Sequence, residues 1–135
     1  MSEKNQKFSE VFFLKKEEPS YFSSFEELLE NLVIRGDFLK SDLLYAFALV
    51  EHFLVFTNLR GPIDFHKLYN MAALVAFKYL YEDATWFLPE FSKLTYLEEK
   101  QVSCLETRFL QGINYKVYIS SKKFRFFKNQ IYNQN

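Results

Sequence analysis

The sequence predicts a single all-α domain, and three observations support this prediction. The chain has 135 residues, which is the size of one domain with one hydrophobic core. Apolar residues make up 49% of it, with only three glycines and three prolines, whereas a chain of many short strands needs more turn residues. Apolar side chains also recur every three or four residues over long stretches, which is the period of an amphipathic helix, and no useful length of strand-like alternation occurs.

The first predicted helix starts at a capping box. Ser24 and Glu27 have the spacing of this motif, in which each side chain bonds a backbone N–H at the start of the helix. Leu28 and Leu32 continue at helical spacing, and Gly36 marks the end of this short helix.

Two longer helices should follow and form the centre of the domain. One is predicted from Lys40 to Thr57, after which Arg60-Gly61-Pro62 breaks the chain. The next runs from Asp64 to about Tyr81, and its apolar stripe is so broad that neighbours should surround it. The stripe consists of Leu68, Ala72, Val75, Ala76 and Tyr79.

The last part of the domain should hold three shorter elements. Residues 84–94 contain Pro89 and are predicted to form a short helix or turn. Thr95–Glu98 has the form of a second capping box and predicts a helix over 97–113. A final helix is predicted over 121–132. It places Phe124, Phe127 and Ile131 on one face.

Before the first helix, residues 1–21 form a polar, flexible N-terminal arm. Its apolar patch, Val11 to Leu14, either docks on the domain or is disordered, and the sequence leaves both alternatives open. The patch is too short for the core of a signal peptide. The domain itself should span 22–132, and residues 133–135 should form a tail.

Composition excludes several classes of function. Seventeen basic residues balance seventeen acidic ones, so no overall field attracts nucleic acid or an anionic membrane. Cys104 is the one cysteine, and His52 and His66 lie too far apart for a metal site. The longest uncharged apolar run, Met71 to Phe77, is too short to cross a membrane. We expect a soluble, intracellular protein, nuclear or cytoplasmic, with no catalytic, cofactor or metal site and no small-molecule substrate.

Two charged residues lie where the helical pattern favours apolar ones. Glu106 falls in the middle of an apolar arc, and a carboxylate in such a place needs a donor or the edge of an interface. Lys78 ends the apolar run and could pair with Glu82 one turn later. Spacing alone leaves open whether these charges pair within the chain or contact a partner.

Two segments resemble the cyclin box. Asp64–Leu80 is similar to its central helix, above all in the P/U-type cyclins related to fungal phosphate-regulation cyclins. Their His-Arg-Leu start and Ala-rich, Lys-Phe-Leu ending are matched by His66-Lys67-Leu68 and Ala76–Leu80. Leu105–Val117 looks like the later box helix, with its Leu-Glu pair and its ending in an aromatic, a polar and an aliphatic residue. The resemblance covers about residues 22–131.

This resemblance implies a cyclin-box five-helix bundle around a central helix, with an additional N-terminal helix. It implies a regulatory subunit that binds and activates a cyclin-dependent protein kinase by positioning its αC helix. In cyclins the Lys and Glu that match Lys78 and Glu106 are the charged pair at the kinase-binding surface. The other matching positions of that surface are Tyr79, Glu82, Leu110, Tyr115 and Val117.

Other features leave alternatives open. The helix containing Ser41–Leu49 lacks the Met-Arg-x-x-Leu-x-x-Trp element of mitotic-type cyclins, so substrate docking of that kind is not expected. Glu51-His52 stands where related cyclins have Asp-Arg, which puts a buried Asp-based bond in doubt. The basic, aromatic segment Lys122–Lys128 could bind nucleic acid, as cyclin folds do in basal transcription factors. The zero net charge favours a solvated basic face instead. An adaptor that binds a non-kinase protein is the remaining alternative.

Overall fold

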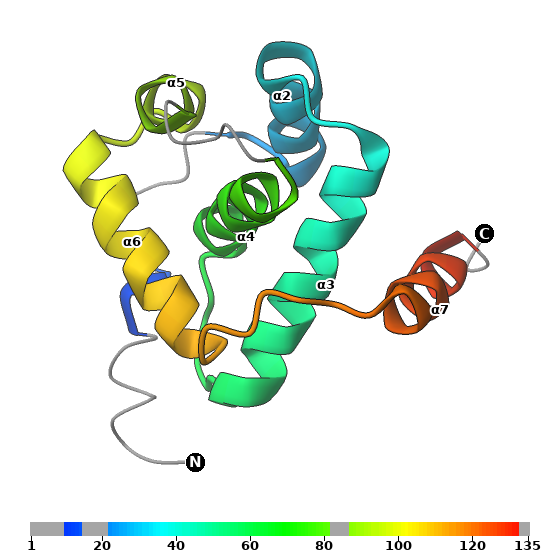
Figure 1. Ribbon diagram of the computed structural model, residues 1–135. Coiled ribbons are helices and arrows are strands. Elements are labelled where there is room, and N and C mark those ends of the chain that lie inside the picture. Colours follow the sequence, from blue (N-terminus) through cyan, green and yellow to red (C-terminus); the bar gives the residue numbers. More distant parts are fainter. Residues whose placement is uncertain (1–9, 15–21, 82–86, 133–135) are drawn as a thin grey trace.

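The computed structural model describes residues 10–14, 22–81 and 87–132. Within these residues the fold is helical, and its β structure is one isolated bridge between Phe13 and Ile63. The all-α prediction is therefore confirmed. The elements are η1 Glu10–Phe12, α2 Phe25–Gly36, α3 Lys40–Thr57, α4 Phe65–Leu80, α5 Phe87–Thr95, α6 Glu99–Gly112 and α7 Ser121–Tyr132 (Figure 1).

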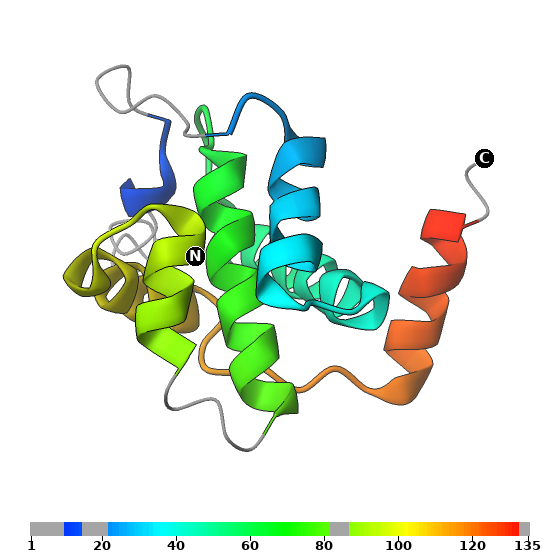
Figure 2. The same cartoon turned by 90° about the horizontal axis from the view of Figure 1, so that it is seen from above.

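Helix α4 is the central helix of the domain. It packs most extensively against α3 and also contacts α6. Helix α2 lies alongside it, with the ring of Phe25 4.9 Å from that of Tyr69, and α7 lies further out (Figures 1 and 2). Every residue from Leu68 to Ala76 is buried, so neighbours cover this helix on all sides. The sequence-based expectation of a central helix is thus correct. Buried residues of α4 and α6 share the core, among them Leu68, Ala72, Ala76, Val102, Leu105 and Phe109.

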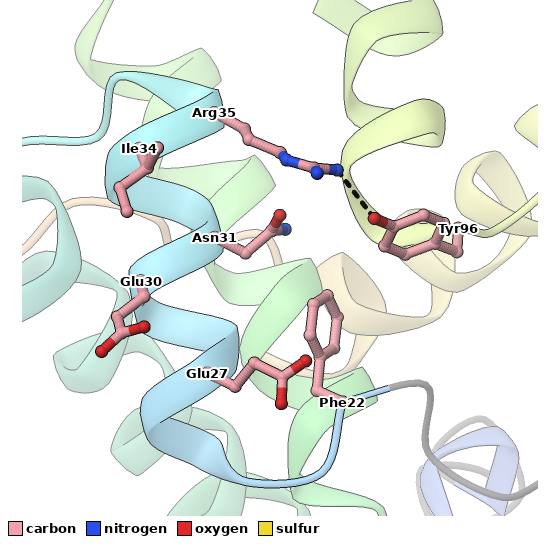
Figure 3. A pocket seen from close by; sticks show the side chains of 7 residues that line it. All are labelled: Phe22, Glu27, Glu30, Asn31, Ile34, Arg35 and Tyr96. Carbon is pink, nitrogen blue, oxygen red and sulfur yellow. Dashed lines mark hydrogen bonds between the residues drawn. The ribbon is translucent and has the colours of Figure 1, made fainter.

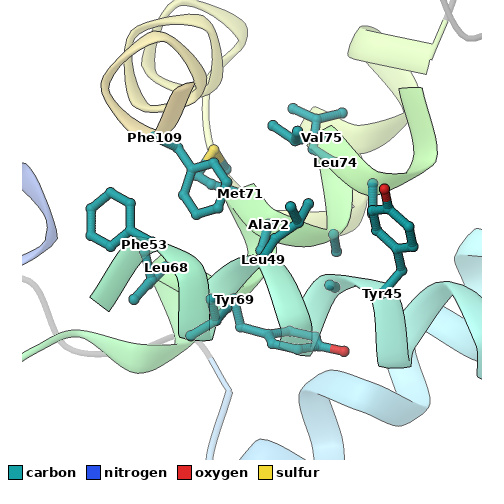
Figure 4. Packing of buried hydrophobic residues seen from close by; sticks show 14 of the residues in the cluster. Tyr45, Leu49, Phe53, Leu68, Tyr69, Met71, Ala72, Leu74, Val75 and Phe109 are labelled. Atoms are coloured by element: carbon teal, nitrogen blue, oxygen red, sulfur yellow. The ribbon is translucent and has the colours of Figure 1, made fainter. Parts of the chain in front are cut away.

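Small residues let the neighbours approach α4 closely. Ala72, Ala73 and Ala76 have no exposed surface, and large side chains of α3 and α6 fill the space beside them (Figure 4). Tyr69 is also completely buried, and its hydroxyl donates to the backbone oxygen of Leu43 at 2.9 Å. Burial raises the pKa of Tyr69, so the hydroxyl stays protonated at neutral pH and can donate to α3.

The first helix begins as predicted but ends for a different reason. Ser24 Oγ accepts from the backbone N–H of Glu27 at 3.1 Å. Gly36 still belongs to α2, and Asp37 is the residue with a left-handed backbone, at φ 57°. A Cβ atom on Gly36 would come within 2.9 Å of the side chains of Leu94 and Phe38. Gly36 is therefore required by close packing against α5 rather than by the turn.

The second predicted capping box is wrong. Thr95 is the last residue of α5, is buried, and donates its hydroxyl to the backbone oxygen of Phe91 at 2.9 Å. Tyr96 then takes a left-handed conformation, at φ 63°, which turns the chain away from α5. Helix α6 starts only at Glu99, and Glu98 before it makes no side-chain cap. Thr95 therefore belongs to α5, and Glu98 rather than Thr95 is the residue that precedes the first turn of α6.

The apolar patch of the N-terminal arm docks on the domain. Phe12 is completely buried, with its ring edge-on to Phe53 at 5.3 Å and to Phe109 at 6.4 Å. The backbone N–H of Asp64 donates to the oxygen of Phe12 at 2.8 Å. Residues 10–14 thus pack with the helices rather than forming part of a free arm. The rest of the arm and the tail 133–135 lie outside the described residues.

Candidate functional site

Lys78 and Glu106, which the sequence singles out separately, form an ion pair. Lys78 lies in the last turn of α4 and Glu106 in the middle of α6, and these two helices are neighbours. Lys78 Nζ is 2.9 Å from Glu106 Oε2 and 3.1 Å from Oε1. Of the alternatives left open by spacing, a pair within the chain is present. Glu82, the other proposed partner of Lys78, lies outside the described residues.

The pair lies at the surface of the domain. The side chain of Lys78 is 34% exposed and that of Glu106 is 17% exposed. An ion pair in such a position contributes about 0 to 1 kcal/mol to stability, because water screens it and ordering two side chains costs entropy. Both groups also keep hydrogen-bonding capacity, since an ammonium has three donors and each carboxylate oxygen accepts more than one bond. The pair can therefore still bind groups of a partner protein.

Tyr79 extends this surface along α4. It is 46% exposed, and its ring stacks on Tyr45 of α3 with centroids 6.1 Å apart. The hydroxyl of Tyr45 donates to the backbone oxygen of Val117 at 2.7 Å and accepts from the N–H of Ile119 at 3.0 Å. Burial is the main cause that raises the pKa of Tyr45. Tyr45 thus holds the segment after α6 next to the exposed end of α4.

The three predicted residues at and after the end of α6 differ in exposure. Leu110, one turn after Glu106, is half-buried against the core, as is Val117. Tyr115 is 62% exposed and has φ 60°, an unusual backbone for a tyrosine. Its N–H donates to the oxygen of Leu110 at 2.8 Å, which closes the turn. The turn therefore directs a tyrosine side chain into solvent beside the end of α6.

The predicted site residues within the described ranges gather in one region. It is built from the last turn of α4, the second half of α6 and the segment that follows α6. We call the six residues of this region the pair surface, namely Lys78, Tyr79, Glu106, Leu110, Tyr115 and Val117. Sequence reasoning chose them from two segments, and the fold brings these segments together through the α4 and α6 contact and through Tyr45.

Sequence reasoning missed a buried carboxylate near this region. Asp42, in the first turn of α3, is almost completely buried, and its Oδ2 accepts from the N–H of Leu39 at 2.9 Å. The hydroxyl of Tyr81 lies 2.9 Å from Oδ1 and 3.0 Å from Oδ2. Burial and then Asp42 raise the pKa of Tyr81. The position of Asp42 near a helix start could have suggested a cap, but no local pattern points to Tyr81.

A groove runs beside this hydrogen bond, between the start of α3, the end of α4 and α7. Leu80 is among its exposed apolar residues. At the wall of this groove the carboxylate of Asp42 accepts from the N–H of Leu39 and from the hydroxyl of Tyr81. The groove is lined by Ser41, Asp42, Tyr45, Leu80, Tyr81, Ile119, Ser121 and Phe124.

A second hollow lies along α2 (Figure 3). Arg35 spans it and donates to the hydroxyl of Tyr96 at 2.8 Å, and Asn31 donates to the backbone oxygen of Leu94 at 2.8 Å. These side chains hold α2 against the turn after α5. None of the residues predicted for the functional site lines this hollow.

The described part of the chain holds neither a metal-binding group nor a membrane-spanning helix. No three His, Cys, Asp or Glu side chains there are grouped so that they could hold a metal ion. No helix there has the length and apolar character needed to cross a membrane.

Comparisons with known proteins found no family model, no curated protein and no solved structure that matches the chain significantly. The resemblance to cyclins therefore depends on the residues of two segments, Asp64–Leu80 and Leu105–Val117, together with the contact that the fold makes between them.

Proposed function

We propose that the chain is a cyclin-like regulatory subunit, with a cyclin-box arrangement of its helices, that binds and activates a cyclin-dependent protein kinase. The main observation in favour is the ion pair between Lys78 and Glu106, at 2.9 Å. These residues come from two separate segments that resemble cyclins, and the matching residues of cyclins are the charged pair at the kinase-binding surface. The pairing also gives Glu106 the donor that its apolar surroundings require, so it supports the proposal through the two segments that resemble cyclins and not by itself.

The surroundings of the pair suit a protein interface. Tyr79 and Tyr115 are exposed at its margins, and tyrosine is enriched in interfaces because a rigid ring buries much area at low entropic cost. Leu110 and Val117 are half-buried, and the part of each side chain that remains exposed adds apolar area to the pair surface. An interface that holds a kinase in its active form is expected to bury more than about 2,000 Å² in total, so residues beyond the pair surface must contribute.

The mechanism we propose is allosteric. A cyclin-dependent kinase is inactive while its αC helix is misplaced, because the glutamate of that helix then fails to pair with the lysine that holds the ATP phosphates. A subunit that binds the active arrangement more tightly than the inactive one shifts the kinase toward activity. This chain would supply binding energy, and all chemical groups of phosphoryl transfer would belong to the kinase.

Affinity capture tests the proposal. Tagged full-length chain, expressed in its native cell, should recover a cyclin-dependent kinase, which mass spectrometry identifies. Lys78→Ala and Glu106→Ala should each reduce that recovery. Lys93→Ala changes an exposed lysine on α5 and is the matched control, which should leave recovery unchanged.

Addition of the purified chain to the purified kinase should then raise phosphorylation of a standard substrate. Recovery of a stable partner that is not a kinase would favour the adaptor alternative. Equal recovery of the kinase by wild type and both pair variants would reject the pair surface as the contact.

A further inference from the structure

The zero net charge of the chain conceals a strong separation of charge along the sequence. No acidic residue follows Glu106, so all seventeen lie at or before it, together with eleven of the seventeen basic residues. The basic residues after Glu106 are Arg108, Lys116, Lys122, Lys123, Arg125 and Lys128. The end of this chain is therefore strongly basic, and a charge total cannot reveal it.

Helix α7 presents much of this charge at an edge of the molecule. It stands apart from α5 and α6 and packs against α3 (Figures 1 and 2). Two of its phenylalanines, Phe124 and Phe127, face the domain, and the ring of Phe124 lies 6.0 Å from that of Tyr45. Phe127 also packs against the core. The inward face of α7 is thus occupied.

The outward face of α7 combines cations with an exposed aromatic ring. Lys122, Arg125, Phe126 and Asn129 are all exposed, and helical spacing of three and four residues makes them neighbours. We call these four the basic face. The ring of Phe126 is 64% exposed, whereas many other aromatic rings of this chain are buried in the core. Phe126 thus places an exposed aromatic ring beside the two cations of this face.

The position of the lysines is not explained by helix stability. The first turn of α7 holds Lys122 and Lys123 and no acidic residue, whereas the positive end of the helix dipole favours acidic residues there. Ser120 Oγ accepts from the N–H of Lys123 at 3.1 Å and so caps this end. Lys116 and Lys123, after burial, also contribute to lowering the pKa of His52 on α3. Positive potential thus accumulates around the start of α7.

We infer that the basic face binds a single-stranded nucleic acid, RNA or DNA. Lys122 and Arg125 would contact backbone phosphates, and Lys123 beside them would add to the attraction. Phe126 would stack on an unpaired base, and Asn129 offers hydrogen bonds to a base edge or a sugar. Cations beside an exposed ring are the combination that proteins use for single strands. This inference goes beyond the proposed kinase binding and uses a different surface.

A membrane fits the same helix less well. A helix that lies in a membrane interface inserts its apolar face among the lipids, but that face of α7 packs against the domain. The acidic part of a second copy of this chain is another anionic surface, and it also offers exposed rings such as Tyr96 beside Glu27 and Glu30. Membrane binding and self-association are therefore both included among the outcomes of the test.

Fluorescence polarisation with full-length chain tests the inference. The probes are labelled oligo-U RNA and oligo-dT DNA, with duplex DNA for comparison, over a salt series. We expect binding of at least one single strand more tightly than about 10⁻⁴ M at physiological salt, weakening steeply as salt rises. The two single-stranded probes distinguish RNA from DNA. Lys122→Gln with Arg125→Gln should weaken binding and reduce the magnitude of the slope of log affinity against log salt by about 1.4.

Matched variants separate charge and stacking from general damage. Lys93→Gln with Lys100→Gln removes two exposed charges from α5 and α6 and should bind like wild type. Phe126→Leu keeps an apolar side chain but removes the ring, and it should weaken binding about five- to a hundredfold. Circular dichroism checks that each variant is folded. Kinase recovery should be the same for wild type and for the basic-face variants, so failure of one proposal leaves the other intact.

Four results would overturn the inference. One is no binding of either single strand by wild type, and another is equal binding by wild type and the doubly neutralised basic face. The third is binding to vesicles that contain anionic phosphatidylserine with none to oligonucleotides. The fourth is salt-sensitive self-association in analytical ultracentrifugation that the basic-face variant abolishes while oligonucleotides remain unbound.

Discussion

Gly112 lies directly against the ring of Phe53, so closely that any side chain on Gly112 would collide with it. A Cβ atom there would be 2.1 Å from Phe53 Cε2 and 2.6 Å from Cδ2. The ring cannot easily move, because it stacks on Phe109 at 5.2 Å and meets Phe12 edge-on at 5.3 Å. The end of α6 is therefore fixed against α3 by the absence of a side chain. This contact sets where the segment bearing Tyr115 leaves the helix.

Gly112→Ala should destabilise the domain. The added methyl group must displace a packed aromatic ring, and overpacking of this kind costs about 1 to 3 kcal/mol. Urea unfolding of both proteins measures the difference in the free energy of unfolding. Ser103→Ala, at an exposed position of the same helix, is the control and should have little effect. A Gly112→Ala protein as stable as wild type would show that α6 can shift away from Phe53 without loss.

Tyr81→Phe should destabilise the domain at neutral pH. It removes a donor from the buried carboxylate of Asp42, and leaving a buried acceptor short of a donor costs about 1 to 3 kcal/mol.

In wild type the folded-state pKa of Tyr81 is raised above its ordinary value of 10.0. The protonated tyrosine thus contributes stability that is complete below pH 10 and is lost as pH rises through the folded-state pKa. Unfolding measured from pH 7 to 11 should show this loss in wild type and a smaller one in Tyr81→Phe. Tyr118→Phe, at an exposed tyrosine, is the matched control.

The pH dependence of stability on the acidic side should depend on His52. Burial, followed by Lys123 and Lys116, lowers its pKa below the ordinary 6.5, while Glu51 acts in the opposite direction. The unfolded chain therefore binds a proton near pH 6.5 that the folded chain does not. Stability should fall as pH drops below about 6.5, until the folded-state pKa is reached, and His52 contributes no slope well above that window. Urea unfolding between pH 5 and 7.5 should show a shallower slope for His52→Gln than for wild type. His66→Gln is the control, because it makes the same change at the other histidine. If the free energy of unfolding of His52→Gln depends on pH as steeply as that of wild type, this prediction is contradicted.

The long helices were predictable because their apolar period is strong and their ends are clear. The bounds expected for Lys40–Thr57 and Ser121–Tyr132 agree with α3 and α7. The boundary between α5 and α6 was predicted wrongly, because Thr95 could cap either the helix before it or the one after it. Tertiary packing decided this, since Thr95 is buried and bonds Phe91.

The site was predictable only in part, because periodicity shows which face of a helix a residue occupies and not what lies opposite. The sequence marked Lys78 and Glu106 as charges on apolar faces, but their mutual contact spans 28 residues and depends on how α4 and α6 pack. The bond from Tyr81 to Asp42 spans 39 residues and has no local signal. The basic residues of α7 were visible in the sequence. The total charge does not reveal them, because it sums over the whole chain and omits how the charges are distributed along it.

The pair of Lys78 and Glu106 should matter little for stability and much for binding. Because the pair is partly exposed, Lys78→Ala and Glu106→Ala should each change the free energy of unfolding of the isolated chain by no more than about 1 kcal/mol. Kinase association should weaken by about 2 to 5 kcal/mol for each change, since the opposing kinase group would be left buried without its partner. Thermal melts and calorimetric titration of both single variants and the double variant measure the two quantities, and the double-mutant cycle gives the coupling between the charges. If the single variants lose several kcal/mol of stability but bind the kinase normally at a temperature where all are folded, the pair serves the fold alone. Unchanged melting temperatures with weakened binding would instead place the pair in the interface, because an ion pair that contributes little to the free chain can influence association only through the partner that covers it.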